Sequence, residues 1–82
     1  MLKIVEVKVE DIYVPAARRA EFDQSKVDAI VEAMMNGDQQ QPIRVRKGKG
    51  RLVLISGVNR LEAAKTVGET KLGVYIVQAR KF

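Results

Sequence analysis

The sequence of 82 residues contains no cysteine and no histidine. Without cysteine, the chain cannot form a disulfide framework, a zinc-thiolate site or a cysteine nucleophile. Without histidine, it also lacks the commonest metal ligand and general base of proteins. These two absences exclude most familiar catalytic and metal-binding sites.

Long apolar runs are also missing, and the longest ones are far too short to span a bilayer. Charged residues interrupt the N-terminal segment, which therefore does not resemble a signal peptide: Lys3, Glu6, Lys8, Glu10 and Asp11. We expect a cytoplasmic protein with no membrane partner.

The composition is that of an ordinary globular chain, with 46% hydrophobic and 30% charged residues. The chain has no internal repeat, linker or low-complexity tract, so residues 1–82 are predicted to form a single domain. Fifteen basic against ten acidic residues give a net charge of +5. This basic balance favours nucleotides or nucleic acid as partners, although it could equally serve solubility alone.

In the first half of the chain, alternating apolar residues predict a strand over residues 2–9, with an irregular continuation over 11–15. Residues 16–21 are expected to form a loop or a short helical turn. Asp23 is a good N-cap for a helix that ends at Asn36-Gly37. One face of this helix is apolar, at a spacing typical of core residues: Val27, Ile30, Val31, Met34 and Met35.

In the second half, residues 43–47 alternate as a strand, and Gly48-Lys49-Gly50 predicts a tight hairpin turn into a strand over 51–55. A helix over 59–67 and a last strand over 72–78 follow. The element order βαββαβ predicts an α/β fold of the α+β type, a small mixed β-sheet with two main helices.

The turn from the strand into the second helix, at Ser56-Gly57, is the strongest candidate for a site. Free backbone N–H groups and the helix dipole bind phosphate at such a helix start, and glycine allows close approach of the ligand. Arg60 lies in the first turn, where the dipole disfavours a cation unless an anion lies beside it. The alternative is that Gly57 serves only the turn and that Arg60 is solvated.

The hairpin is rich in cations. Its alternation places Arg44 and Arg46 on one face, with Lys47, Lys49 and Arg51 close by. These five side chains are candidates for contacts to DNA phosphates, and the alternative is a solvated sheet face.

Three segments, Phe22-Asp23, Gln41-Pro42-Ile43-Arg44-Val45 and residues 54–68, resemble the ParB N-terminal domain, also called the ParB-like nuclease domain, of the ParB/sulfiredoxin superfamily. In that family a glutamine-proline-isoleucine strand leads to a glycine-glutamate-arginine-arginine box. An alanine-rich helix that ends in glycine follows the box. The likeness covers nearly the whole chain in the same order.

The resemblance implies binding of a nucleoside triphosphate, which is CTP in chromosome-partition ParB proteins and ATP in sulfiredoxins, with the need for magnesium left open. Gly57 and Arg60 match the phosphate-contacting residues of the box, and Arg19 matches an arginine that faces the phosphates. The full set of phosphate or nucleotide candidates is Ser56, Gly57, Asn59, Arg60, Arg19, Gln41 and Pro42. The implied role is that of a regulator or adaptor in DNA maintenance, segregation or plasmid partition.

The departures from the family limit the enzymatic expectations. Val58 and Asn59 stand where sulfiredoxins have the catalytic cysteine and a histidine, so peroxiredoxin reduction is not expected. Ser56 replaces the acidic residue of the free-serine kinases, while Glu21 could match their general base. Acidic residues are scattered, so no metal site is predicted.

Three functions therefore stay open: a non-catalytic or weakly hydrolytic nucleotide-binding module, a DNA-binding protein without sequence specificity that uses the hairpin, and a phosphotransfer or nuclease enzyme. An exposed strand edge makes a homodimer plausible, and a protein partner also stays open.

Overall fold

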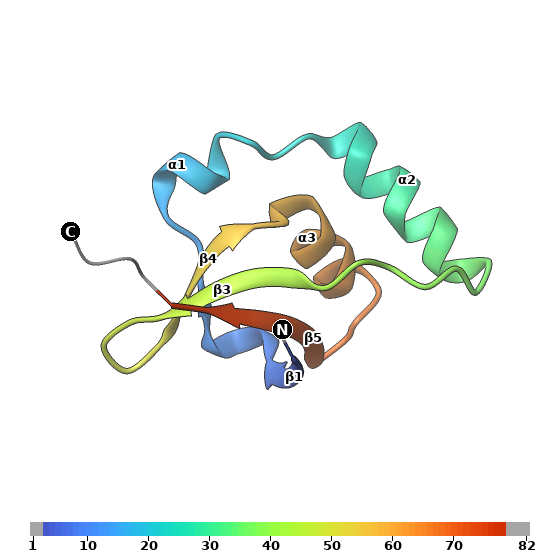
Figure 1. Ribbon diagram of the computed structural model, residues 1–82. Helices are drawn as coiled ribbons and strands as arrows, with labels where there is room; N and C mark the ends of the chain where they lie inside the picture. The colour runs from blue at the N-terminus through green and yellow to red at the C-terminus, as the bar shows by residue number, and fades with distance from the viewer. Residues whose placement is uncertain (1–2, 79–82) are drawn as a thin grey trace.

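The computed structural model describes residues 3–78, which form a curled mixed sheet with helices packed on it (Figure 1). The elements in chain order are β1 (Ile4–Lys8), the 3-10 helix η1 (Val9–Asp11), β2 (Ile12–Tyr13), α1 (Ala16–Arg19), α2 (Gln24–Met35), β3 (Ile43–Lys47), β4 (Leu52–Ser56), α3 (Val58–Thr66) and β5 (Lys71–Val77). The predicted α/β class and mixed sheet are confirmed.

The strands are ordered β1-β5-β3-β4-β2 across one sheet. The hairpin β3–β4 is antiparallel, as predicted, and its register pairs Lys47 with Leu52. β5 lies parallel to β3 on one side, and β2 lies parallel to β4 on the other. β1 pairs antiparallel with β5, so both ends of the described chain lie at the same edge.

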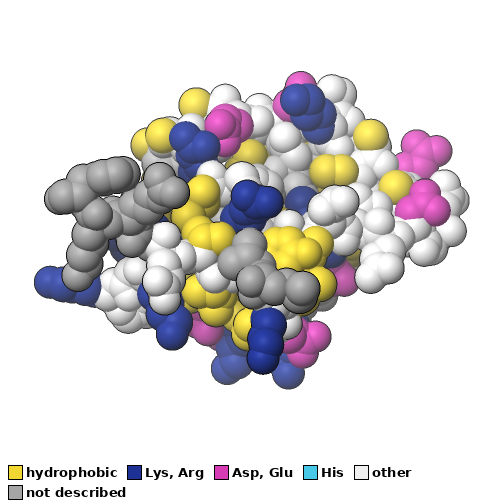
Figure 2. Space-filling view, in the orientation of Figure 1, with side chains coloured by type: hydrophobic (Ala, Val, Ile, Leu, Met, Phe, Trp, Pro, Cys, Tyr) yellow, Lys and Arg dark blue, Asp and Glu magenta, His cyan; other side chains and the backbone are white. Residues whose placement is uncertain are grey.

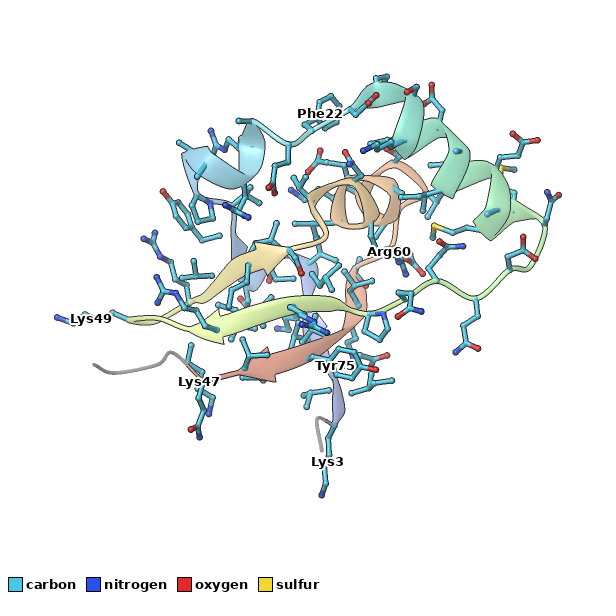
Figure 3. The ribbon with its side chains drawn as sticks, turned by 45° about the horizontal axis from the view of Figure 1, so that its top comes forward. Lys3, Phe22, Lys47, Lys49, Arg60 and Tyr75 are labelled. Carbon is cyan, nitrogen blue, oxygen red and sulfur yellow. The ribbon has the colours of Figure 1, made fainter. Side chains whose placement is uncertain are left out.

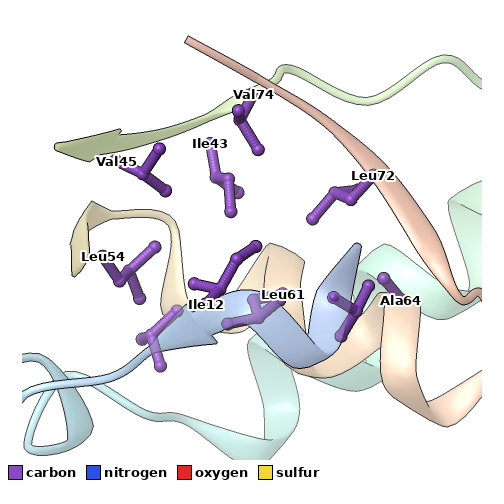
Figure 4. Close-up of a cluster of buried hydrophobic side chains, with 10 residues drawn as sticks. Ile12, Ile43, Val45, Leu54, Leu61, Ala64, Leu72 and Val74 are labelled. Atoms are coloured by element: carbon purple, nitrogen blue, oxygen red, sulfur yellow. The ribbon is translucent and has the colours of Figure 1, made fainter. Parts of the chain in front are cut away.

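The core lies between one face of the sheet and α3 (Figure 4). Ile43 and Val45 of β3 are buried there, while Arg44 between them is exposed, so the predicted alternation is confirmed. Leu61 and Ala64 of α3 are fully buried against these strands. Burial of each large apolar side chain contributes about 1.5–3 kcal/mol to folding, and this packing fixes where α3 begins.

The helix α2 packs on α3 and starts at the predicted N-cap, Asp23, whose side chain accepts a hydrogen bond from the Ser25 N–H. Val27 is buried, but Met35 is 79% exposed, so its predicted place in the core is wrong. An α-helix turns about 100° per residue, which places Met34 about 20° but Met35 about 80° away from Val27. The buried face of α2 is therefore narrower than the row of apolar residues in its sequence.

The N-terminal segment differs from the single long strand that the alternation predicts. β1 ends at Lys8, and η1 then turns the chain across the sheet to β2. The predicted strand start at Leu2 lies outside the described residues. Ile4 and Val5 are 60% and 40% exposed, because β1 is an edge strand that α3 does not cover.

No helix between residues 3 and 78 is long and apolar enough to cross a membrane. Lys and Arg side chains are distributed among small apolar patches on the face that Figure 2 shows.

Candidate functional site

The turn between β4 and α3 is built around Gly57, which caps the helix with a φ of +102°. A Cβ atom at this position would lie 2.6 Å from Cγ2 and 3.0 Å from Cβ of Ile43. Ile43 is 1% exposed and cannot move away. Backbone conformation and packing therefore both require glycine here, whether or not a ligand binds.

The N-terminus of α3 presents free donors. Its first helical hydrogen bond joins the Leu61 N–H to the Gly57 carbonyl oxygen at 2.9 Å, so the N–H groups of Val58, Asn59 and Arg60 precede the ladder. Gly57 has no side chain that could cap them, and Ser56 beside it is exposed. An anion can therefore approach the positive end of the helix dipole from the side of Ser56 and Gly57, which are exposed, whereas Val58 is only 5% exposed.

The Arg60 side chain does not extend into solvent, because only 17% of it is exposed. It lines a pocket of about 340 Å³, here called the Arg60 pocket, together with Gln41 and Pro42. Figure 3 shows Arg60 beside α3, next to the chain that runs from α2 into β3. The interpretation of Arg60 as a solvated side chain is wrong.

The guanidinium group of Arg60 has weak partners. Its Nη1 atom lies 3.5 Å from Glu69 Oε1 and 3.6 Å from the Met34 sulfur. Its Nε atom is buried and has no hydrogen-bond partner among the described residues. A guanidinium carries five N–H donors, so this group retains capacity for a stronger acceptor such as a phosphate oxygen.

Asn59 ties the start of α3 to the start of α2. Its Oδ1 atom accepts from the Asp23 N–H at 2.9 Å, and its Nδ2 atom donates to the Glu21 carbonyl oxygen at 3.4 Å. Arg18 adds a second link, donating to the Ile55 carbonyl oxygen at 3.2 Å. The N-termini of two helices are thus held side by side, and Asn59 has a structural role in addition to any contact with a ligand.

Asp23 is the acidic group at this junction. Its carboxylate accepts from the hydroxyl and the N–H of Ser25, and these bonds lower its pKa below the ordinary value. The carboxylate is therefore the form that the folded state favours.

Arg19 lies elsewhere. It lines a separate pocket of about 590 Å³ with Phe22 and with Val58, Glu62 and Lys65 of α3, on the side of α3 that faces α1. The structure thus brings Arg60, Gln41 and Pro42 into one pocket, and places Arg19 in another together with Val58, the first residue of α3.

The remaining predicted residues are dispersed. Arg44 and Arg46 point away from the core, and Lys49 lies at the tip of the hairpin (Figure 3). Arg51 stacks on Tyr13, with its guanidinium carbon 3.7 Å from the ring centroid. The Glu21 carboxylate pairs with Arg18 at 3.2 Å. Among residues 3–78, no three acidic side chains gather into a group that could hold a metal ion.

Glu69 and Arg18 were missed by the sequence reasoning. Glu69 reaches Arg60 only because the chain turns back after α3, and no periodicity links the two positions. Arg18 and Arg19 are adjacent identical residues, so only the geometry of α1 tells which one contacts β4.

The ParB N-terminal domain family matches residues 1–81. The chain belongs to this family. The predicted resemblance is therefore confirmed. No curated protein sequence gives a significant match.

Solved structures share the fold of this ParB N-terminal domain. Sulfiredoxin from Arabidopsis thaliana is 30% identical, with a TM-score of 0.80 over 94% of this chain and 86% of that one. The C-terminally truncated partition protein ParB from Caulobacter crescentus, solved with CTP-γ-S, is 18% identical, with a TM-score of 0.80 over 96% of this chain and 46% of that one. A free serine kinase variant solved with AMP is 16% identical, with a TM-score of 0.76 over 90% of this chain and 30% of that one. The domain therefore spans less than half of the partition protein and of the kinase.

The constraint at Gly57 can be measured against a second glycine. Gly50 also has a positive φ, but nothing lies within 4 Å of its added Cβ. Gly50→Ala should lower the free energy of unfolding by about 1–2 kcal/mol, the cost of a left-handed conformation. Gly57→Ala should lose a further ~1–3 kcal/mol through overpacking against Ile43. Urea unfolding measures both, and equal losses would contradict the close approach.

The lowered pKa of Asp23 predicts a stability that depends on pH. The carboxylate stabilises the folded state above the ordinary pKa, and this contribution is lost as the pH falls from about 4 through the lower folded-state value. Asp23→Asn keeps a capping oxygen but cannot titrate. The small stability difference between wild type and this variant, followed by thermal unfolding, should shrink on acidification. A difference independent of pH would disprove the assignment.

Proposed function

We propose that this ParB N-terminal domain binds a nucleoside triphosphate, with the phosphates on the N–H groups of Val58, Asn59 and Arg60 at the start of α3. The observation that supports this most strongly is Arg60 in the first turn of α3, whose side chain is mostly buried and whose Nε is unpartnered among the described residues. Its Nη1 atom lies toward Met34 and Glu69. The module acts as a non-catalytic or weakly hydrolytic regulator or adaptor in DNA maintenance or segregation.

The unused hydrogen-bonding capacity of Arg60 favours an anion, while Asp38 and Glu69 near it oppose one. A charged side chain that leaves water loses hydration, and strong hydrogen bonds must replace it. The Glu69 carboxylate at 3.5 Å supplies part of this compensation to Arg60, at a distance longer than an optimal charge-assisted bond. A phosphate at the start of α3 would add both a full counter-charge and short acceptors.

The Arg60 pocket is proposed to hold the base and sugar of the nucleotide. Gln41 and Pro42 line it, and its volume of about 340 Å³ lies in the range of small-ligand sites. The Gln41 amide can both donate and accept hydrogen bonds, as recognition of a base edge requires. CTP and ATP are the proposed nucleotides, and magnesium would enter with the phosphate oxygens.

Glu21 supports no catalytic proposal, since its carboxylate pairs with Arg18 rather than facing Arg60. Arg19 shares its pocket with Val58, whose N–H is one of the proposed donors, and Arg19 is therefore proposed to contact the phosphates from that side of α3.

Calorimetric titration with CTP, ATP, GTP and UTP, with and without magnesium, tests the proposal. At least one triphosphate should bind, and the matching nucleoside without phosphates should not. Absence of binding by all four would disprove the proposed function.

Arg60→Ala should weaken triphosphate binding by more than about tenfold, because a charge-assisted contact to phosphate contributes about 1.5–3 kcal/mol. Lys49→Ala is the matched control, since Lys49 is an exposed cation at the tip of the β3–β4 hairpin and lines neither pocket. Circular dichroism confirms that each variant folds. Glu69→Gln tests the same site without removing Arg60, and it should tighten binding because a competing carboxylate is lost. Equal affinities of Arg60→Ala and wild type would exclude this role of Arg60.

A further inference from the structure

The face of the sheet opposite α3 is not covered by any helix of residues 3–78 (Figure 1). Strand register places Arg44, Tyr75 and Ile4 in one row across β3, β5 and β1. Arg46 and Val77 form the next row on the same face. These five residues are called the open sheet face.

The cations of the open sheet face have no acidic partner among the described residues. No ion pair between residues 3 and 78 involves Arg44 or Arg46. Glu6 projects from β1 on the same side, but it pairs with Gly73, one row away from the Arg44–Tyr75 row. The Arg44 side chain is exposed, and the net charge of +5 attracts polyanions from a distance.

The Tyr75 ring is not part of the core. Leu72 and Val74 lie on the inner face of β5 and belong to the core. Tyr75 lies on the outer face of the same strand, paired with Arg44. Figure 3 shows Tyr75 on the side of the sheet away from α3. The neighbouring outward position on β5 is Gly73, which has no side chain to cover the ring. Tyr75 therefore presents a partly exposed aromatic surface beside Arg44.

We propose that the open sheet face binds single-stranded nucleic acid without sequence specificity. Bases stack on Tyr75, while Arg44 and Arg46 contact the phosphates on either side. A duplex keeps its bases stacked inside and offers this face only phosphates, so a single strand uses both kinds of side chain. This face adjoins the Arg60 pocket at Ile4, but Arg44, Arg46 and Tyr75 do not line that pocket, so their variants test this face separately from nucleotide binding at Arg60.

Fluorescence anisotropy with a labelled strand of about twelve thymidines, and with a duplex of the same length, tests this proposal. The single strand should bind more tightly. Tyr75→Ala should weaken its binding at least about fivefold, and Tyr75→Phe, which keeps the ring, should retain it. Loss of binding in both variants, or in neither, would overturn the stacking role.

The phosphate contacts are tested by the dependence of affinity on salt. Replacing Arg44 and Arg46 with alanine should make the slope of log K against log salt shallower by about 0.7 for each contact, or about 1.4 for both. Lys26→Ala with Lys65→Ala removes the same charge from α2 and α3 and should change the slope less. Equal slopes in the two double variants, tighter duplex binding or no binding by wild type would each reject the proposal.

Discussion

The close approach of Gly57 to Ile43 is the constraint on which the rest of the site depends. A glycine with positive φ lets the chain leave β4 and enter α3 directly over the buried Ile43 side chain. Because Ile43 follows Pro42, the start of α3 lies next to the segment that leads from α2 into β3. The Arg60 pocket lies along this segment, and its lining residues come from parts of the chain that are far apart in sequence.

The burial of Arg60 follows from this geometry and has an electrostatic consequence. The side chain passes between α2 and α3, where Met34 and Glu69 are its neighbours, instead of reaching water. A guanidinium in this position retains hydrogen-bonding capacity that the described residues do not use. Asn59 and Arg18 hold the surrounding loop, so the N-termini of α2 and α3 meet near the same point. The first turn of α3 therefore combines a fixed glycine turn, free N–H donors and one incompletely paired cation.

Short-range sequence patterns correctly predicted the elements that depend only on neighbouring residues. The alternation through Ile43 and Val45, the glycine-rich turn and the Asp23 cap each act over a few residues, and all three agree with the structure. Gly57 was identified because a glycine at a helix start lets a ligand approach the backbone, and Arg60 because the helix dipole disfavours a cation in the first turn. Which pocket a residue lines depends on tertiary packing, and a short-range sequence pattern does not predict tertiary packing. Arg19 and Arg60 therefore could not be separated from sequence, and neither the exposure of Met35 nor the contact with Glu69 could be predicted.

Amide proton–nitrogen correlation spectra of the isotope-labelled domain, recorded during titration with a nucleoside triphosphate, test the central claim most directly. We expect the largest shifts at the N–H groups of Val58, Asn59 and Arg60, because these donors precede the helical ladder of α3. The corresponding nucleoside, which has no phosphates, should leave them unchanged. Saturable binding of the triphosphate without shifts at these three amides would contradict the account.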